Sequence, residues 1–400
     1  MNAFSFIKKP ARTNKTISID SSLGNVLITG GSRKATEEVI RDYAIDTVNN
    51  NIGLVVFRDH KSGVSCYPSI SSSGRLIHEI DCTENSTTEQ INAFSGMTDS
   101  EINSYIIKLF DMYNEIDKSR KMSYQSYVTM LRSLAQKAGK RVRLNNLADF
   151  PIEELETLNS SFCTGTEFNR NDRFLNSIRA EISELESYFL DFSTNAAGYV
   201  LSGKNSIEQI FKTKPIIEVS LDFAGKAEES TIIMSAIIDA ISRADFTSAP
   251  VSGINTVVDG APNSFLIDSG LQKLIKSSKS IKVLFSVQDI SNLVETSNEW
   301  IDYADSYFFF RQNSNNNKEF CSAFFGEYEK KKETVTKTVN APSFWDILSG
   351  KGGDTNRQKS TAVSKEKERV YPPEVFASLP DNQAIYYNKK TNEHTYLNVF

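Results

Sequence analysis

The stretch Leu23-Gly-Asn-Val-Leu-Ile-Thr-Gly-Gly-Ser-Arg-Lys-Ala-Thr decides the fold. Its apolar run, residues 26–28, predicts a buried strand, which ends where Gly30 and Gly31 begin a turn. The apolar spacing over residues 37–45 then predicts a helix. Backbone N–H groups and the positive end of the helix face an anion when a strand, a glycine turn and a helix follow in this order. The stretch therefore predicts an α/β sheet whose first strand leads into a phosphate-binding loop.

The loop departs from the complete phosphate-binding pattern, G-x-x-x-x-G-K-[ST]. Counting from Gly30, the sixth position is Ala35 instead of glycine, and the seventh is Thr36 instead of lysine. We interpret the stretch as a shortened or eroded loop, and an ordinary strand-to-helix turn is the alternative. The residues of the stretch that could contact a nucleotide are Gly30, Gly31, Ser32, Lys34 and Thr36.

The composition is that of a globular protein of 400 residues, 39% hydrophobic and 24% charged. This length predicts two or three structural units with a large core. The net charge of −5 means that binding of nucleic acid would need a local basic patch. The four cysteines are scattered and the chain has three histidines, so we expect no structural zinc site and reduced thiols, as in the cytoplasm.

No apolar run reaches the length of a membrane span, and the run in residues 1–9 is too short for a signal peptide. We therefore expect a cytoplasmic protein, or one that lies at the inner membrane through its partners.

A second apolar run, Gly53-Leu-Val-Val-Phe-Arg-Asp-His-Lys, predicts a parallel strand that is buried on both faces. Asp59 and Lys61 would lie at its carboxyl end, where open α/β sheets bind ligands; a salt-bridged turn is the alternative. Further strands are predicted at 74–80, 214–222, 264–269, 281–289 and 306–312, with helices at 228–243 and 271–276. Alternating strands and helices predict a parallel sheet with right-handed crossovers.

Between the strands, residues 85–195 carry apolar positions at spacings of three and four, which predicts amphipathic helices. We interpret this block as an all-helical insertion. Its basic cluster consists of Lys137, Lys140, Arg141 and Arg143. The cluster either contacts nucleic acid or an acidic partner, or is a solvated helix end.

The predicted domain division follows these patterns. Residues 1–84 and 196–349 form the two parts of an α/β domain, and 85–195 form the helical domain. Residues 350–370 are rich in Gly, Lys, Ser, Asp and Thr and predict a flexible linker. Residues 371–400 predict a tail that returns to the α/β domain and ends in a strand pair.

ATP hydrolysis needs phosphate donors, a Mg²⁺ ligand and a group that positions water. Asp268 ends a run predicted as a strand, where a magnesium-binding carboxylate belongs; a helix N-cap is the alternative. Ser269 follows it where most such ATPases have a glutamate, and serine cannot accept a proton at neutral pH as a carboxylate can. Gln288 could face a γ-phosphate or be a buried, hydrogen-bonded side chain. Arg311 could be an arginine finger or a salt-bridged strand end.

The order of elements resembles the soluble ATPase domain of the type IV secretion coupling proteins, the TraG/TraD-like conjugation motors related to FtsK and HerA. The helical block takes the place of the all-alpha domain of that family. The matching stretches are residues 25–32 (phosphate loop), 54–63 (following strand), 265–268 (Walker B strand), 284–289 (Gln-ending strand) and 369–385 (closing segment).

The resemblance implies a P-loop NTPase fold of the RecA/FtsK-like kind, in which a parallel sheet carries an inserted all-helical domain. It also implies ATP and Mg²⁺ as cofactors, a homo- or hetero-hexamer, secretion or conjugation subunits as partners, and DNA or secreted protein as substrate. The degenerate motifs favour a pseudo-ATPase that acts as a scaffold or recognition subunit. One alternative is an active translocase with a variant loop, in which Asp289 could supply the missing carboxylate. Another is a nucleotide-independent nucleic-acid-binding protein that uses residues 137–143 and 350–370.

Overall fold

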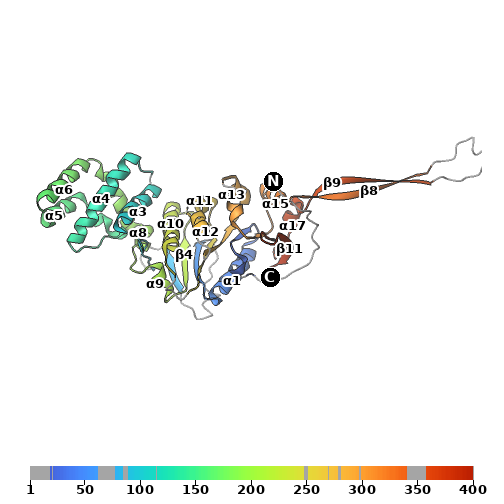
Figure 1. Ribbon diagram of the computed structural model, residues 1–400, viewed down its shortest axis with the longest axis horizontal. Coiled ribbons are helices and arrows are strands. Elements are labelled where there is room, and N and C mark those ends of the chain that lie inside the picture. Colours follow the sequence, from blue (N-terminus) through green and yellow to red (C-terminus); the bar gives the residue numbers. More distant parts are fainter. Residues whose placement is uncertain are drawn as a thin grey trace, which may run out of the picture.

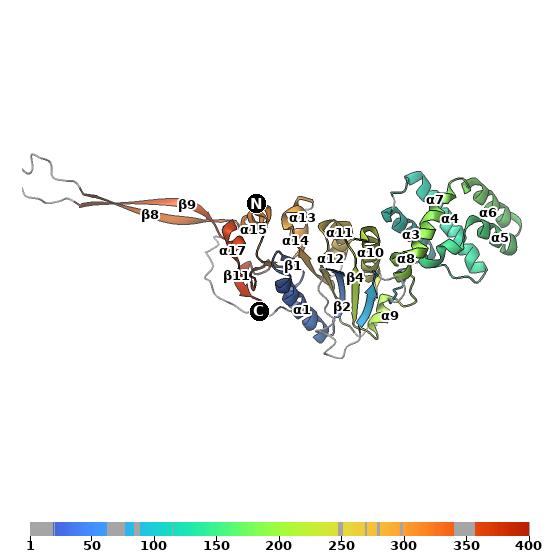
Figure 2. The ribbon, with the colours of Figure 1, turned by 180° about the vertical axis from the view of Figure 1, so that it is seen from behind.

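The computed structural model describes residue 19 and residues 21–61, 77–83, 89–113, 115–246, 251–268, 270–277, 281–296, 299–339 and 357–399. The molecule is elongated, with a group of helices at one end, a sheet flanked by helices in the middle and a two-stranded ribbon at the other end (Figure 1). The view from behind shows the same three parts in line (Figure 2).

The described strands form a nine-stranded sheet in the order β11-β10-β7-β1-β6-β5-β2-β4-β3. Seven neighbouring strands are parallel, and β10 and β11 add an antiparallel edge beside β7. The strands are β1 (Val26–Thr29), β2 (Gly53–Asp59), β3 (Ile77–Asp81), β4 (Ile216–Leu221), β5 (Ile254–Asp259), β6 (Ile281–Val287), β7 (Ser306–Phe309), β10 (Gln383–Asn388) and β11 (Glu393–Asn398). The predicted α/β class with a mainly parallel sheet is confirmed, and so is the closing strand pair.

Helices cover both faces of this sheet, because its central strands are apolar on both sides. Helix α1 (Arg33–Asn49) packs on one face, where Val39, Ile40 and Tyr43 join a cluster with Val26 and Ile28. The other described helices of this part are α10 (Ala227–Arg243), α11 (Asn263–Asp268), α12 (Leu271–Ser277), α13 (Ile290–Thr296), α14 (Glu299–Tyr303), α15 (Asn315–Phe325), α17 (Pro373–Ser378) and the 3-10 turn η1 (Ser21–Leu23).

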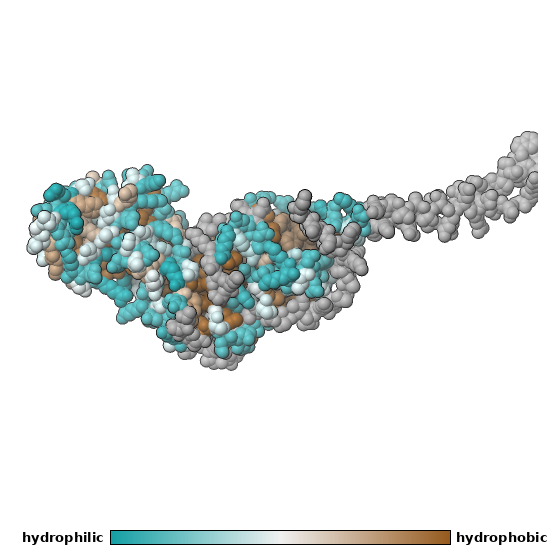
Figure 3. All heavy atoms as spheres, viewed as in Figure 1, coloured by the Kyte–Doolittle hydropathy of each residue, from teal (hydrophilic) through white to brown (hydrophobic). Residues whose placement is uncertain are grey.

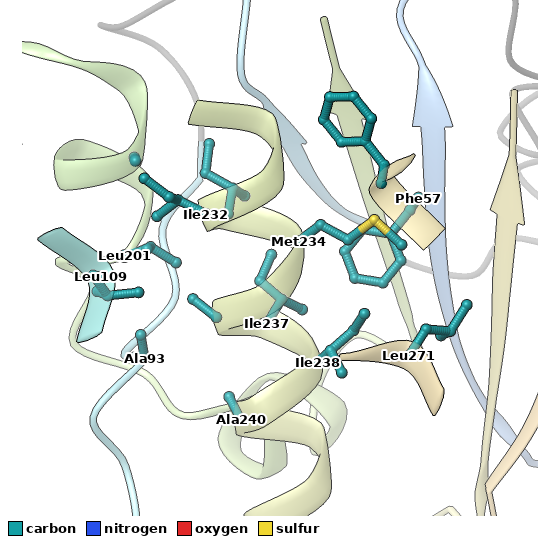
Figure 4. Packing of buried hydrophobic residues seen from close by; sticks show 14 of the residues in the cluster. Phe57, Ala93, Leu109, Leu201, Ile232, Met234, Ile237, Ile238, Ala240 and Leu271 are labelled. Carbon is teal, nitrogen blue, oxygen red and sulfur yellow. The ribbon is translucent and has the colours of Figure 1, made fainter. Parts of the chain in front are cut away.

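Helix α10 joins the sheet to the helical region. In Figure 4, Met234 and Ile238 lie toward Phe57 and Leu271, whereas Ile232 lies toward the helical region. Nearly every residue from Ile232 to Ile241 is buried, which explains why this helix is apolar all round. One continuous apolar core therefore runs from the sheet into the helices.

The helical region lies between β3 and β4 in the chain. Its elements are α3 (Asp99–Tyr113), α4 (Lys118–Lys137), η2 (Leu144–Asp149), α5 (Ile152–Phe162), α6 (Gly165–Ile178), α7 (Ile182–Thr194), α8 (Ala196–Val200) and α9 (Ile207–Phe211). The predicted amphipathic faces meet in its core, where the rings of Phe110 and Phe192 lie 5.0 Å apart. Helices continue past residue 195 as far as Phe211, and the predicted boundary at residues 84 and 85 lies outside the described residues.

The strand predicted at 264–269 is wrong. Residues 263–268 form helix α11, and the strand is β5, the preceding run Ile-Asn-Thr-Val-Val-Asp. A short apolar run such as Phe265-Leu-Ile fits a strand or a helix equally well. In the structure the run begins a helix, whose first turn forms as the Pro262 carbonyl accepts hydrogen bonds from the backbone N–H groups of Phe265 and Leu266.

The flexible linker predicted at 350–370 is wrong for residues 357–369. These form β9 (Arg357–Arg369), which pairs antiparallel with β8 (Glu327–Val339) along its whole length. The prediction failed because the ribbon lacks the apolar alternation that marks a half-buried strand. Residues 350–356 lie outside the described part of the chain.

Among the described residues, no helix is both long enough and apolar enough to span a bilayer. Hydrophilic residues cover much of the visible face of the helical region, and the hydrophobic ones between them are scattered (Figure 3).

Candidate functional site

The connection from β1 to α1 is three residues long: Gly30, Gly31 and Ser32. Both glycines have positive φ angles, 71° and 87°, a conformation that residues with a side chain rarely adopt. The hydroxyl of Ser32 caps the helix by accepting a hydrogen bond from the N–H of Ala35 at 3.4 Å. The turn is therefore tight, and α1 begins at Arg33, four residues earlier than the sequence pattern predicted.

Three donors of the loop and of the first turn of α1 are already engaged within the protein. The N–H of Gly30 donates to the carbonyl of Val287 at 3.3 Å, and that of Gly31 donates to the carbonyl of Arg311 at 2.8 Å. The buried Thr36 hydroxyl donates to the carbonyl of Ser32 at 3.5 Å. Phosphate-binding loops work because such groups point outward to the ligand. Here they hold the loop against the sheet.

Gln312 closes the space beneath the loop. Its side chain is buried, and its Nε2 donates to the carbonyls of Thr29 at 3.1 Å and Phe310 at 3.0 Å. A Cβ atom added to Gly30 would lie 2.2 Å from this Nε2, and one added to Gly31 would lie 2.7 Å from Cβ of Phe310. Sequence reasoning missed Gln312, although its place at the end of the predicted strand 306–312 was the available signal.

The other predicted contacts, Lys34, Asp59 and Lys61, lie at the start of α1 and at or just after the end of β2. Lys34 is exposed in the first turn of α1. Arg33 reaches across, and its Nη1 donates to the carbonyl of Lys61 at 3.2 Å. Asp59 is buried and accepts a hydrogen bond from the N–H of Lys61 at 3.2 Å, so its carboxylate stabilises the turn after β2. The structure thus brings the turns after β1 and β2 together through Arg33.

The aspartate at the end of a buried strand is Asp259, whereas the sequence pattern assigned this place to Asp268. Asp259 ends β5, the strand beside β6, and its buried carboxylate accepts a hydrogen bond from the Ser286 hydroxyl at 2.5 Å. The next residue is Gly260, so no carboxylate follows to activate water. Asp268 is the last residue of α11, and Ser269 lies outside the described residues. The β-branched run that ends in Asp259 was the signal that the sequence offered.

Gln288 and Arg311 follow β6 and β7, as predicted. Gln288 is exposed, and its backbone carbonyl accepts a hydrogen bond from Asn317 Nδ2 at 3.2 Å. The Arg311 guanidinium is half exposed, and its Nη1 lies 3.7 Å from Oδ1 of Asp381. Such an exposed pair contributes little to stability.

Asp289, which could have supplied the missing catalytic carboxylate, is engaged in hydrogen bonds at the start of a helix. Its Oδ1 accepts hydrogen bonds from the Ser291 hydroxyl at 2.8 Å and from the N–H of Asn292 at 3.1 Å. A carboxylate in this position caps the start of α13.

These groups do not fit the phosphates of a nucleotide in the usual P-loop position. Both glycine N–H groups of the loop are engaged by carbonyls, and no lysine stands at the place that the pattern requires. In the described part of the chain, no group of three or more His, Cys, Asp and Glu side chains is arranged to hold a metal ion.

The predicted basic cluster of the helical region is divided between ion pairs and a cavity. Lys137 Nζ lies 2.6 Å from Glu167 Oε1, and Lys140 Nζ lies 2.6 Å from Glu154 Oε1. The hydrogen bond from Lys137 lowers the pKa of Glu167 below its usual value and raises the pKa of Lys137.

Arg141 and Arg143 line a cavity of about 500 Å³, together with Lys140 and with Arg132, which pairs with Asp99. The cluster is thus partly neutralised, and its guanidinium groups border a polar recess.

Solved structures share the overall fold of this chain. The bacterial conjugative coupling protein TrwB, in its unbound form, matches with a TM-score of 0.59 at 13% identity, over 98% of this chain and 89% of that one. The chain has the fold of the conjugative coupling proteins. TrwB in complex with ADP and Mg²⁺ matches with a TM-score of 0.57 at 14% identity, over 94% of this chain and 84% of that one.

VirB4 of Thermoanaerobacter pseudethanolicus has a related fold, with a TM-score of 0.54 at 9% identity, over 94% of this chain and 89% of the VirB4 chain. No protein-family model matches the chain, and no curated protein is similar to it in sequence. The predicted resemblance to coupling proteins is confirmed at the level of the fold.

Proposed function

We propose that this chain is a subunit of a type IV secretion or conjugation-like transfer machine, in which the coupling-protein fold serves as a scaffold and hydrolyses no ATP. The likeness to TrwB and VirB4 supports the machine. The observation that carries the scaffold role is the engagement of both glycine N–H groups by the carbonyls of Val287 and Arg311. Opening the loop for a phosphate would break these bonds and displace Gln312.

The active alternative is less well supported, because three requirements fail together. Lys34 stands outside the pattern, Asp289 caps a helix, and glycine follows Asp259. Each loss removes a part of the machinery that lowers the barrier to phosphoryl transfer.

The helical region is the recognition part of this proposal. Its arginine-lined cavity suits an acidic segment of another subunit or of the transported substrate, because guanidinium groups bind carboxylates and phosphates through paired hydrogen bonds. We further propose that the chain works in the cytoplasm, in a homo- or hetero-oligomer peripheral to the inner membrane. DNA and secreted protein are both candidate substrates of the assembly.

The first expected result is that ATP leaves the protein unchanged. A nucleotide at 100 times its Kd would add about 2.7 kcal/mol to the free energy of unfolding, which raises the melting temperature by several degrees. We expect no such shift with millimolar ATP and Mg²⁺, and no phosphate release. Thermal denaturation and calorimetry measure binding, and a coupled phosphate assay measures turnover.

The Lys34→Ala variant is the control for this experiment. If ATP raises the melting temperature of the natural protein and the variant loses that response, the loop binds nucleotide and the protein is a nucleotide-dependent pseudo-ATPase. Phosphate release that the variant lacks would make the chain an active ATPase and end the proposal.

A further inference from the structure

Strands β8 and β9 form a ribbon that projects from the end of the sheet away from the helical region (Figures 1 and 2). They pair over 13 residues, a length of about 40 Å at the usual rise of a strand. The ribbon is held at its base, where the N–H of Val370 donates to the carbonyl of Gly326 at 3.1 Å and the Tyr328 hydroxyl donates to Glu368 at 2.8 Å. Within the described residues, neither strand pairs with a third one.

A two-stranded ribbon of this kind is marginally stable in water on its own. Its sequence offers little apolar surface, since β8 and β9 hold Val335, Val339, Ala362 and Val363 among lysine, glutamate, threonine and serine. An ordered ribbon of this length therefore calls for a partner.

The ribbon has the opposite charge to the rest of the molecule. Its two strands contain nine lysines and arginines and five glutamates, a net charge of +4. The whole chain carries −5, so the remainder carries −9. The net charge of the whole chain therefore does not reveal this basic element. The ribbon is a local basic patch of the kind that nucleic-acid binding requires.

The register divides the charges unequally between the two faces. Directly paired residues share a face of a ribbon, and the faces alternate along each strand. One face then receives seven basic and three acidic positions, whereas the other receives Lys330, Lys332 and two glutamates. The basic positions of the first face, called the cationic face below, are Lys331, Lys337, Arg357, Lys359, Lys365, Lys367 and Arg369.

Two cross-strand pairs on the cationic face place lysine opposite lysine. Lys331 pairs with Lys365, and Lys337 pairs with Lys359. Like charges directly opposite one another destabilise a strand pair. An arrangement that weakens an already marginal ribbon is relieved when an anion lies over the lysines, so these pairs indicate a polyanionic ligand.

We propose that the cationic face of this ribbon lies along the phosphate backbone of a nucleic acid. A two-stranded ribbon fits the major groove of DNA, and lysine, arginine, serine and threonine are the side chains that contact phosphates. The ribbon contains one aromatic residue, Tyr328 at its base, so it offers no platform for base stacking. The contact is therefore independent of sequence and weakens steeply with salt.

The composition argues against a protein partner. The cores of protein–protein interfaces are rich in aromatic residues and arginine and depleted of lysine and glutamate. The ribbon has the reverse composition: seven of its nine basic residues are lysines, it holds five glutamates, and its single aromatic residue is Tyr328.

The test compares two double variants of the full chain that remove equal charge from the same ribbon. Lys331→Gln with Lys365→Gln removes one opposed pair from the cationic face, and Lys330→Gln with Lys332→Gln changes the other face. Fluorescence anisotropy with labelled duplex DNA of arbitrary sequence measures the affinity across a range of salt concentrations. We expect the first variant to bind about tenfold more weakly, and the slope of log K against log salt to fall by about 1.8. The second variant should bind like the natural protein.

Equal losses in the two variants, or no DNA binding by the natural protein at 50 mM salt, would overturn the proposal. Folding is checked by melting temperature, which the first variant should not lower because it removes a repulsion. Chemical cross-linking of the ribbon lysines to the acidic body of a second copy, unchanged by added DNA, would assign the ribbon to self-assembly and also overturn the proposal. The inference does not depend on the fate of the scaffold proposal, because ATP plays no part in the test.

Discussion

Replacing Gly30 with alanine is expected to lower the free energy of unfolding by about 3 kcal/mol, from unfavourable backbone conformation and overpacking together. The new Cβ would lie 2.2 Å from Gln312 Nε2 and 2.6 Å from the carbonyl oxygen of Arg311. Gln312 cannot withdraw without losing its hydrogen bonds to Thr29 and Phe310. Urea unfolding, followed by far-UV circular dichroism, measures the change.

Gly270 provides a matched control. Its φ angle is also positive, at 77°, but an added Cβ would meet no atom within 4 Å. Gly270→Ala should therefore cost about 1 kcal/mol, the contribution of the backbone alone. If both variants lose the same free energy, the packing of the loop against Gln312 does not hold the loop closed and does not exclude a phosphate.

Replacing Glu218 with alanine should cost about 3 to 5 kcal/mol, the usual effect of removing one member of a buried ion pair. Glu218 Oε1 accepts a hydrogen bond from Arg58 Nε at 2.8 Å, and the two side chains are 2% and 15% exposed. The variant leaves the guanidinium of Arg58 in the sheet without this carboxylate. Chemical denaturation of the purified variant gives the change in free energy.

The informative comparison is the double variant Arg58→Met with Glu218→Leu. Hydrophobic residues of similar volume often replace a buried ion pair without loss of stability. We expect the double variant to unfold within about 1 kcal/mol of the natural protein. A double variant as unstable as Glu218→Ala would show that the pair itself stabilises the sheet.

The sheet was predictable where its strands are buried on both faces. Runs such as 26–28, 53–59 and 281–287 are nearly continuous apolar stretches, so their composition alone marks them. Strand β5 was not predicted because Asn255 and Thr256 interrupt its apolar run. Both side chains are buried, and Asn255 hydrogen-bonds Thr47 of α1 at 2.9 Å, a compensation that no local pattern reveals.

The position of the candidate site in the fold was predictable from the sequence, but the contacts that close its loop were not. The glycine turn lies at the end of β1 as expected, and its missing lysine is visible in the sequence. Whether the loop is open depends on Gln312, which is 283 positions from the Thr29 carbonyl that it contacts. The roles of Lys137 and Lys140 likewise depend on acidic residues of other helices. Such contacts arise from packing, which periodicity does not encode.

The central place of β1 has a consequence for how the protein is made. Val26 pairs with Leu284 on one side and with Ser306 on the other, so both neighbours of this strand leave the ribosome long after it does. Strands β2 to β5 can assemble on the growing chain, whereas β1 must wait beside them with its apolar residues uncovered. Closure of so many distant pairings makes folding slow and leaves an aggregation-prone intermediate. Chaperone capture during translation should accordingly concentrate on nascent chains that end before residue 281.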